Sequence, residues 1–174
     1  MVTQVSSKLS DTSQLRKSLG NPWQFRLYLL SRLPLAFFAG LRIERFDENI
    51  SEVSVPYRYS TKNPFKSIYF AALAMAAELS SGIQALDAVQ RAPKSISMLV
   101  KDMKADFTKK ARSRIYFKSK EAKRFNQAVE ACLQQNEGQT VTVHTSGYDQ
   151  SGQKVATFWF TWTFKQKQYP SKNN

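Results

Sequence analysis

Cysteine and histidine are almost missing from this chain of 174 residues, which contains one of each, Cys132 and His144. A single cysteine excludes an internal disulfide, and one histidine leaves no Cys/His cluster for structural zinc. The carboxylates are scattered along the sequence and no glycine-rich phosphate loop is present, so we expect no metal and no resident cofactor. His144 has no nucleophile elbow near it, and we interpret it as a surface residue of a strand.

Long hydrophobic runs are also missing. The most apolar segment, residues 23–41, is interrupted by Arg26 and Arg32, so we expect no membrane span. The N-terminus begins with a polar run and has no apolar secretion core, which predicts a cytoplasmic protein. The length suits one core, so we expect a flexible N-terminus (1–20), a single domain (21–166) and a flexible tail (167–174).

Acidic residues are few: the chain contains 13 aspartates and glutamates and 26 lysines and arginines, which gives a net charge of +13. This excess favours an anionic partner, and nucleic acid, anionic lipid and the phosphates of coenzyme A or acyl carrier protein all qualify. The alternative is that alternate strand residues simply face water. The basic residues are densest in one stretch: Lys101, Lys104, Lys109, Lys110, Arg112, Arg114, Lys118, Lys120, Lys123 and Arg124.

The first part of the chain predicts a helix followed by a hairpin. Residues 22–33 have helical apolar spacing with Asn21 as the cap, and Pro34 should end this helix. Apolar and polar residues then alternate over residues 41–44 and again over residues 53–60, which predicts two antiparallel strands. Pro56 requires an edge or a bulge in the second strand.

The most informative segment, residues 63–82, is long, alanine-rich and apolar on most sides, which predicts a buried helix. Its cap is either Asn63, with Pro64 in the first turn, or Ser67, and Gly82 suits the residue that ends it. A helix this thin and apolar needs cover on several sides. A strongly curved sheet could provide that cover.

The remainder is mostly strand-like. We expect strands at 95–108 and 115–118, a helix at 119–135, and a hairpin made of 140–145 and 155–164, while residues 83–89 are either a strand or the end of the buried helix. Along the last strand, one face carries Phe158, Phe160, Trp162 and Phe164. The order of elements predicts an α+β fold.

Short motifs in this order carry a family resemblance. They are Gly40-Leu41-Arg42-Ile43, Val53-Ser54-Val55-Pro56-Tyr57, Asn63-Pro64, Ser67-Ile68-Tyr69 and Ala77-Glu78-Leu79 with Gly82. Over residues 34–165 the chain resembles an uncharacterised, domain-of-unknown-function branch of the hotdog superfamily, related to phenylacetyl-CoA-type acyl-CoA thioesterases. The resemblance implies a long central helix wrapped by a curved antiparallel sheet, here with an extra N-terminal helix. It also implies a homodimer or a dimer of dimers.

The resemblance implies a catalytic site as well. In active relatives a histidine-glycine-glycine turn begins the central helix, and a carboxylate follows about nine residues later. Alignment of the carboxylate on Glu78 places Tyr69, Phe70 and Ala71 at that turn, where the β-carbons of Phe70 and Ala71 would hinder close approach of a thioester. Asn63 matches an asparagine that some relatives use near the thioester, and Tyr69 could offer a hydroxyl in place of the histidine.

We therefore take Glu78, Asn63 and Tyr69 as candidate catalytic residues. Glu78 sits among apolar neighbours and could activate water or attack the acyl carbon, or it could lie on a solvated face or pair with an arginine. Asn63 could instead cap a helix or turn, and Tyr69 could belong to the core. The candidate substrate-binding residues are Ser67, Phe70 and Ala71 near the thioester, with Lys109, Lys110, Arg112 and Arg114 at the phosphates.

Three functions remain open from the sequence. The first is a thioesterase-like protein that hydrolyses or binds acyl-CoA or acyl-carrier thioesters in a tunnel between the central helices of a dimer, with coenzyme A present only as part of the substrate. The second is a non-catalytic fatty-acyl binder. The third is a basic surface that binds nucleic acid or an anionic membrane, because of the +13 charge and the apolar residues 23–38.

Overall fold

The computed structural model describes residues 21–167, so the predicted flexible N-terminus and residues 168–174 of the predicted tail lie outside the described part. The described residues contain a six-stranded antiparallel sheet with the strand order β1-β2-β4-β5-β6-β3. The elements are α2 (Pro22–Arg32), α3 (Pro34–Ala39), β1 (Arg42–Phe46), β2 (Ser51–Val55), η1 (Tyr59–Thr61), α4 (Phe70–Arg91), β3 (Ile96–Phe107), β4 (Ile115–Ser119), α5 (Ala122–Gln135), β5 (Gln139–Tyr148) and β6 (Lys154–Gln166).

The predicted first helix corresponds to α2, and Asn21 caps it by accepting hydrogen bonds from the Trp23 and Gln24 backbone N–H groups. Helix α2 ends before Pro34 as predicted, but residues 34–39, for which no element was predicted, are helical. Pro34 begins a second short helix, α3, because a proline has no N–H to lose in the first helical turn and its fixed φ suits that position. Gly40, with φ of 75°, ends α3 in the left-handed conformation.

The predicted hairpin is confirmed as the antiparallel pair β1 and β2. The second strand is shorter than expected and ends at Val55, directly before Pro56. Tyr59 begins the one-turn helix η1 instead of continuing the strand. Because a proline cannot donate a ladder hydrogen bond, β2 ends before Pro56, although apolar and polar residues continue to alternate beyond it.

The predicted buried helix is α4, but it starts later than predicted and does not end at Gly82. The two residues before Phe70 make other hydrogen bonds: the Ile68 N–H donates to Ala111 O (2.8 Å) and the Tyr69 N–H donates to Thr61 O (2.7 Å). Helix α4 therefore starts at Phe70, and neither Asn63 nor Ser67 caps it. Gly82 lies inside the helix, which continues to Arg91, so residues 83–89 take the helical option.

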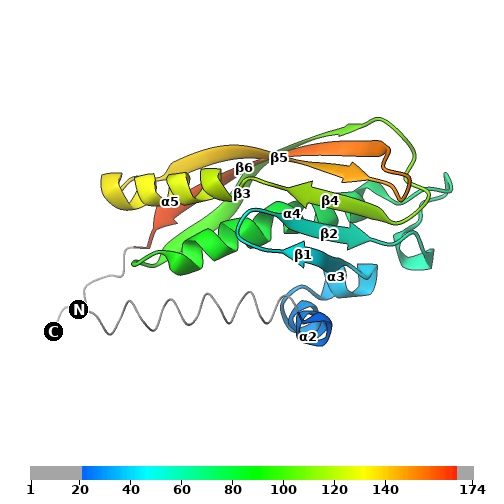
Figure 1. The fold of residues 1–174 in the computed structure, drawn as a ribbon, viewed down its shortest axis with the longest axis horizontal. Coiled ribbons are helices and arrows are strands. Elements are labelled where there is room, and N and C mark those ends of the chain that lie inside the picture. The colour runs from blue at the N-terminus through cyan, green and yellow to red at the C-terminus, as the bar shows by residue number, and fades with distance from the viewer. Residues whose placement is uncertain (1–20, 168–174) are drawn as a thin grey trace.

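The sheet curves around α4, which lies along its concave side, and α5 packs beside α4 on the same side (Figure 1). The core between these layers contains fully buried aromatic side chains: Phe117, Phe125, Phe158, Phe160 and Phe164. The predicted strands 95–108 and 115–118 correspond to β3 and β4, and the C-terminal hairpin to β5 and β6. The α5 helix starts at Ala122, three residues after the expected start at residue 119.

Candidate functional site

A cleft of about 660 Å³ opens at the N-terminal end of α4. Three segments line it: the loop before α4, the first turn of α4, and the end of β3 with the loop that follows. Six of the ten candidate site residues line this cleft: Asn63, Ser67, Tyr69, Phe70, Lys109 and Lys110. The chain therefore brings together residues that are more than 40 positions apart in the sequence.

Asn63 organises the loop on one side of the cleft. Its Oδ1 atom accepts hydrogen bonds from the Phe65 N–H (3.0 Å), the Ser67 N–H (3.2 Å) and the Ser67 hydroxyl (3.2 Å). Lys66 has a positive φ of 57° within the same turn. The Asn63 side chain thus fulfils the turn-capping role that the sequence left open, and its oxygen is already occupied by three donors.

The start of α4 presents free backbone donors to the cleft. Tyr69 occupies the N-cap position but its side chain makes no capping hydrogen bond, and the first turn contains no acidic residue. The Ala72 N–H donates to Tyr69 O (2.9 Å), but the two N–H groups before it, of Phe70 and Ala71, come too early in the helix to have a partner within it. The helix dipole places about half a positive charge at this end. This end of α4 is therefore suited to polarise a carbonyl oxygen.

Aromatic side chains form the apolar walls of the cleft. The Tyr69 and Phe70 rings meet edge to face with their centroids 4.8 Å apart, and the two residues are 48% and 52% exposed. The Phe107 ring, which also lines the cleft, packs edge to face on Phe158 (5.5 Å) and is itself 47% exposed. Exposed aromatic rings that line a cleft can pack against an acyl or aryl group.

The rim of the cleft is basic on the β3 side, where Lys109 and Lys110 are exposed. The Lys109 ammonium group donates a hydrogen bond to the Gln153 side chain. The other two predicted phosphate contacts lie elsewhere. Arg112 is exposed outside the cleft, and the Arg114 guanidinium group donates to the Ser54 hydroxyl (2.9 Å) and lies 3.9 Å from a Glu44 carboxylate oxygen.

Glu78 lies on α4 eight residues beyond Phe70, which corresponds to about 12 Å along the helix axis. It does not line the cleft. Burial raises its pKa to about 7. A β-carbon built on Gly82 would lie 3.0 Å from a Glu78 carboxylate oxygen and 3.3 Å from the Trp162 ring, so the glycine leaves room for both side chains.

One face of α4 is only half covered by the sheet and α5. Its residues recur three or four positions apart, as neighbours on one helix face do, and they are all partly exposed. We call this face the open stripe: Ala71, Ala74, Met75, Glu78, Gly82, Leu86 and Val89. The open stripe begins beside the cleft with Ala71 and includes Glu78 one heptad later.

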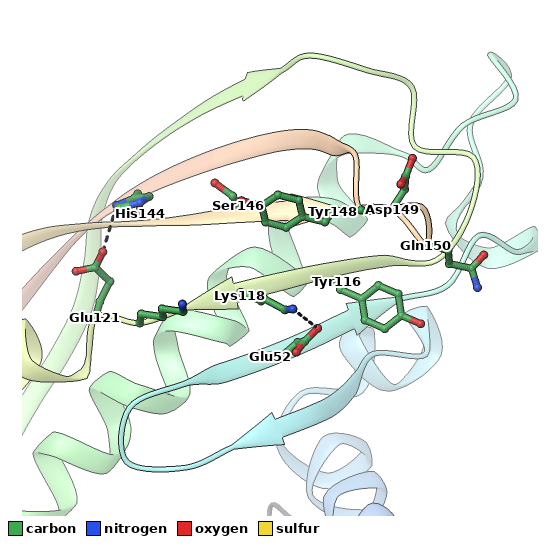
Figure 2. Close-up of a pocket in the computed structure, with 11 residues that line it drawn as sticks. Glu52, Tyr116, Lys118, Glu121, His144, Ser146, Tyr148, Asp149 and Gln150 are labelled. Atoms are coloured by element: carbon green, nitrogen blue, oxygen red, sulfur yellow. Dashed lines mark ion pairs between the residues drawn. The ribbon is translucent and has the colours of Figure 1, made fainter.

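A larger hollow of about 940 Å³ lies on the outer face of the sheet and contains none of the candidate residues (Figure 2). Two pairs of its polar groups lie close together: His144 Nδ1 lies 3.1 Å from a Glu121 carboxylate oxygen, and Lys118 Nζ lies 3.5 Å from a Glu52 carboxylate oxygen. His144 is exposed, as expected for a surface strand residue. Judged by volume alone, this hollow would be the better candidate for the functional site. We prefer the cleft, because it combines uncapped helix donors, aromatic side chains and a basic rim.

Known proteins share the architecture described above. The model of the domain of unknown function DUF4442 matches residues 21–164. The chain belongs to the DUF4442 family. No curated protein matches the chain.

Solved structures similar to this DUF4442 protein include the PA5026 protein of Pseudomonas aeruginosa, with a TM-score of 0.70 and 20% identity over 84% of this chain and 97% of that one. Thioesterase HI1161 of Haemophilus influenzae has a TM-score of 0.56 and 12% identity, covering 83% and 92% of the two chains. The PaaI protein of E. coli, from the phenylacetic acid degradation operon, has a TM-score of 0.55 and 14% identity, covering 84% and 93%. These likenesses confirm the predicted hotdog fold.

Sequence reasoning missed several residues of the cleft in this DUF4442 protein, chiefly Phe65, Leu73 and Phe107. The sequence did contain a signal for Phe107, because this residue ends an alternating strand in which Met103, Ala105 and Phe107 share one face. Phe65 and Leu73 had none, since their positions depend on the turn that Asn63 organises and on the true start of α4.

Proposed function

We propose that the protein is a thioesterase that hydrolyses acyl-CoA or acyl-carrier thioesters. The observation that carries this proposal is the cleft at the start of α4, where uncapped helix donors, aromatic walls and two lysines occur together. The acyl group would lie between Phe70 and Phe107, and the phosphates of the carrier would meet Lys109 and Lys110. The relatives named as thioesterases support the same class of substrate.

In the proposed reaction, the first N–H groups of α4 hold the thioester oxygen while water attacks the carbonyl carbon. Glu78 acts as the general base: it takes a proton from the water and returns it to the departing thiolate as the carbon–sulfur bond breaks. A base with a pKa of about 7 suits this task, because both protonation states are populated at neutral pH.

The separation of about 12 Å between Glu78 and the start of α4 favours a dimer. Two surfaces of a single chain support this arrangement: the open stripe of α4 and strand β3, a long strand at the edge of the sheet. Two copies related by a two-fold axis would pair β3 with β3 and lay the α4 helices across each other. Glu78 of one protomer would then approach the cleft of its partner.

A non-catalytic acyl binder is the second candidate, and two specific features favour it. Phe70 and Ala71 carry β-carbons at the first two positions of α4, which restrict how closely a thioester reaches the backbone donors. The Asn63 oxygen is occupied by three hydrogen bonds within its own turn. A binder of this kind would retain acyl-CoA without releasing the thiol.

Thiol release from a panel of acyl-CoA substrates separates the two candidates. The thioesterase proposal predicts turnover of at least one substrate and a loss of about 100-fold or more in kcat with Glu78→Gln, since a general base typically contributes that much. Glu130→Gln, which changes an exposed acid on α5, is the matched control and should keep full activity. Saturable binding of acyl-CoA with no turnover by the native chain would support the binder instead.

A further inference from the structure

Helix α2 is apolar on two opposite faces. Phe25 and Leu29 are 3% and 1% exposed and pack on the rest of the chain. On the opposite face, Trp23, Leu27 and Leu30 follow one another at helical spacing and are 78%, 66% and 47% exposed. A helix that is apolar on both faces needs a second apolar environment on its outer side.

The same exposure continues along the neighbouring segment. Leu33, Leu35 and Phe38 are 40%, 69% and 63% exposed, whereas Ala36 and Ala39 face inward and are buried. The two helices contact each other, and the Arg26 guanidinium group lies 5.0 Å from the centre of the Phe37 ring. Six large apolar side chains therefore remain uncovered on α2, α3 and their junction, beside the β1 edge of the sheet (Figure 1).

The charge of this region indicates what covers these side chains. Residues 21–43 contain three arginines, Arg26, Arg32 and Arg42, and no aspartate or glutamate. Between α2 and β1, a hollow of about 510 Å³ is lined by Trp23, Phe25, Arg26, Leu41, Arg42, Ile43 and Glu44. Arginine next to exposed tryptophan and leucine is typical of helices that lie in the interface of an anionic bilayer.

We propose that α2 and α3 dock the protein on the surface of anionic phospholipid membranes. Trp23, Leu27 and Leu30 enter the boundary between headgroups and acyl chains, and the arginines meet lipid phosphates. No helix of residues 21–167 is long and apolar enough to cross a bilayer, so the contact is peripheral. This membrane contact is independent of thioester hydrolysis and is tested without an activity assay.

Flotation of the full chain with vesicles tests the proposal. The chain should float with vesicles of equal parts phosphatidylcholine and phosphatidylglycerol, and should bind vesicles of phosphatidylcholine alone much more weakly. Leu27→Gln should weaken binding about tenfold or more, since a buried leucine side chain contributes that much. Arg32→Gln should weaken it about fivefold, with the loss visible only at low salt. Thr142→Gln is the control, because Thr142 is exposed on β5, an interior strand three places from β1 in the sheet.

A fluorophore at position 27 tests whether another surface already covers the helix. Native Cys132 is buried, so an environment-sensitive label on Leu27→Cys reports this position alone. The label should report water in buffer and an apolar environment after anionic vesicles are added, whereas the same label on Thr142→Cys should not respond to vesicles. Either of two results would overturn the proposal: no flotation of the native chain, or a label at position 27 that is already apolar in buffer. Light scattering would then assign the cover to a second copy or to the chain itself.

Discussion

Glu78 shows how a single side chain can take its chemical character from its surroundings. The residues before and after it on α4 are apolar, and burial raises its pKa to about 7. A β-carbon on Gly82 would lie 3.0 Å from a Glu78 carboxylate oxygen, so the glycine leaves space for this group. The group is thus prepared to exchange a proton near neutral pH, at a cost to stability when it is charged.

That cost gives a pH-dependent prediction. The pKa of Glu78 is higher in the folded chain than its ordinary value of 4.5, so the folded state binds more protons between pH 4.5 and about 7 and loses stability as the pH rises through this range. The loss amounts to at most about 3 kcal/mol. Glu78→Gln should therefore raise the free energy of unfolding at pH 8 and leave it nearly unchanged at pH 4, as measured by urea denaturation. Equal effects at both pH values would contradict the assigned burial.

The role of Asn63 could be predicted from the sequence only as one of two options. Asparagine is common both at helix caps and in turns that it closes with its own side chain, and an Asn-Pro pair is compatible with either. The deciding contacts come from distant residues: Thr61 and Ala111 accept the hydrogen bonds that keep Ile68 and Tyr69 extended. No local pattern could reveal those partners.

At the scale of elements, strands and helices with clear periodicity were predictable, and boundaries were not. The alternation over residues 95–108 located β3 within one residue at each end, because nothing interrupts the pattern. The prediction that Gly82 ends the helix is wrong, because a glycine can either end a helix or make room for a close neighbour. Here it makes room for Trp162 and Glu78 within α4.

Gly82→Ala tests that interpretation. An added β-carbon would lie 3.0 Å from the Glu78 carboxylate and 3.3 Å from the Trp162 ring, so the carboxylate should be displaced while the helix gains about 1 kcal/mol of intrinsic propensity. We expect the rate of thioester hydrolysis to fall without a loss of stability, measured by thiol release and thermal unfolding of the same sample. Unaltered activity would mean that the position of the carboxylate does not matter.

A second glycine reports on the packing of β4 against β5. A β-carbon on Gly147 would lie 2.5 Å from the Phe117 ring and 3.0 Å from Ile115, both buried. Gly147→Ala should therefore destabilise the fold by about 1–3 kcal/mol through overpacking, as measured by chemical denaturation. Gly138→Ala is the control, because its β-carbon would meet its nearest atom at 3.9 Å, and it should have little effect.

At the scale of the whole molecule, the proposed dimer depends on β3 and the open stripe of α4. Met103 lies on β3 and is 45% exposed in the single chain. Met103→Asp should place a charge at the proposed contact and shift the protein from dimer to monomer, as measured by light scattering at several concentrations. Thr142→Asp, on the exposed face of the interior strand β5, should leave the mass unchanged. A native chain that is already a monomer would contradict the arrangement.

The pH dependence of thiol release tests the central claim most directly, because it links the chemistry to one carboxylate. If Glu78 is the general base, kcat/KM for a hydrolysed acyl-CoA should rise with pH and level off above a midpoint near its pKa of about 7. Glu78→Gln should remove both the activity and this midpoint. A rate that does not vary between mildly acidic and mildly basic pH, or a profile that Glu78→Gln leaves intact, would contradict the account.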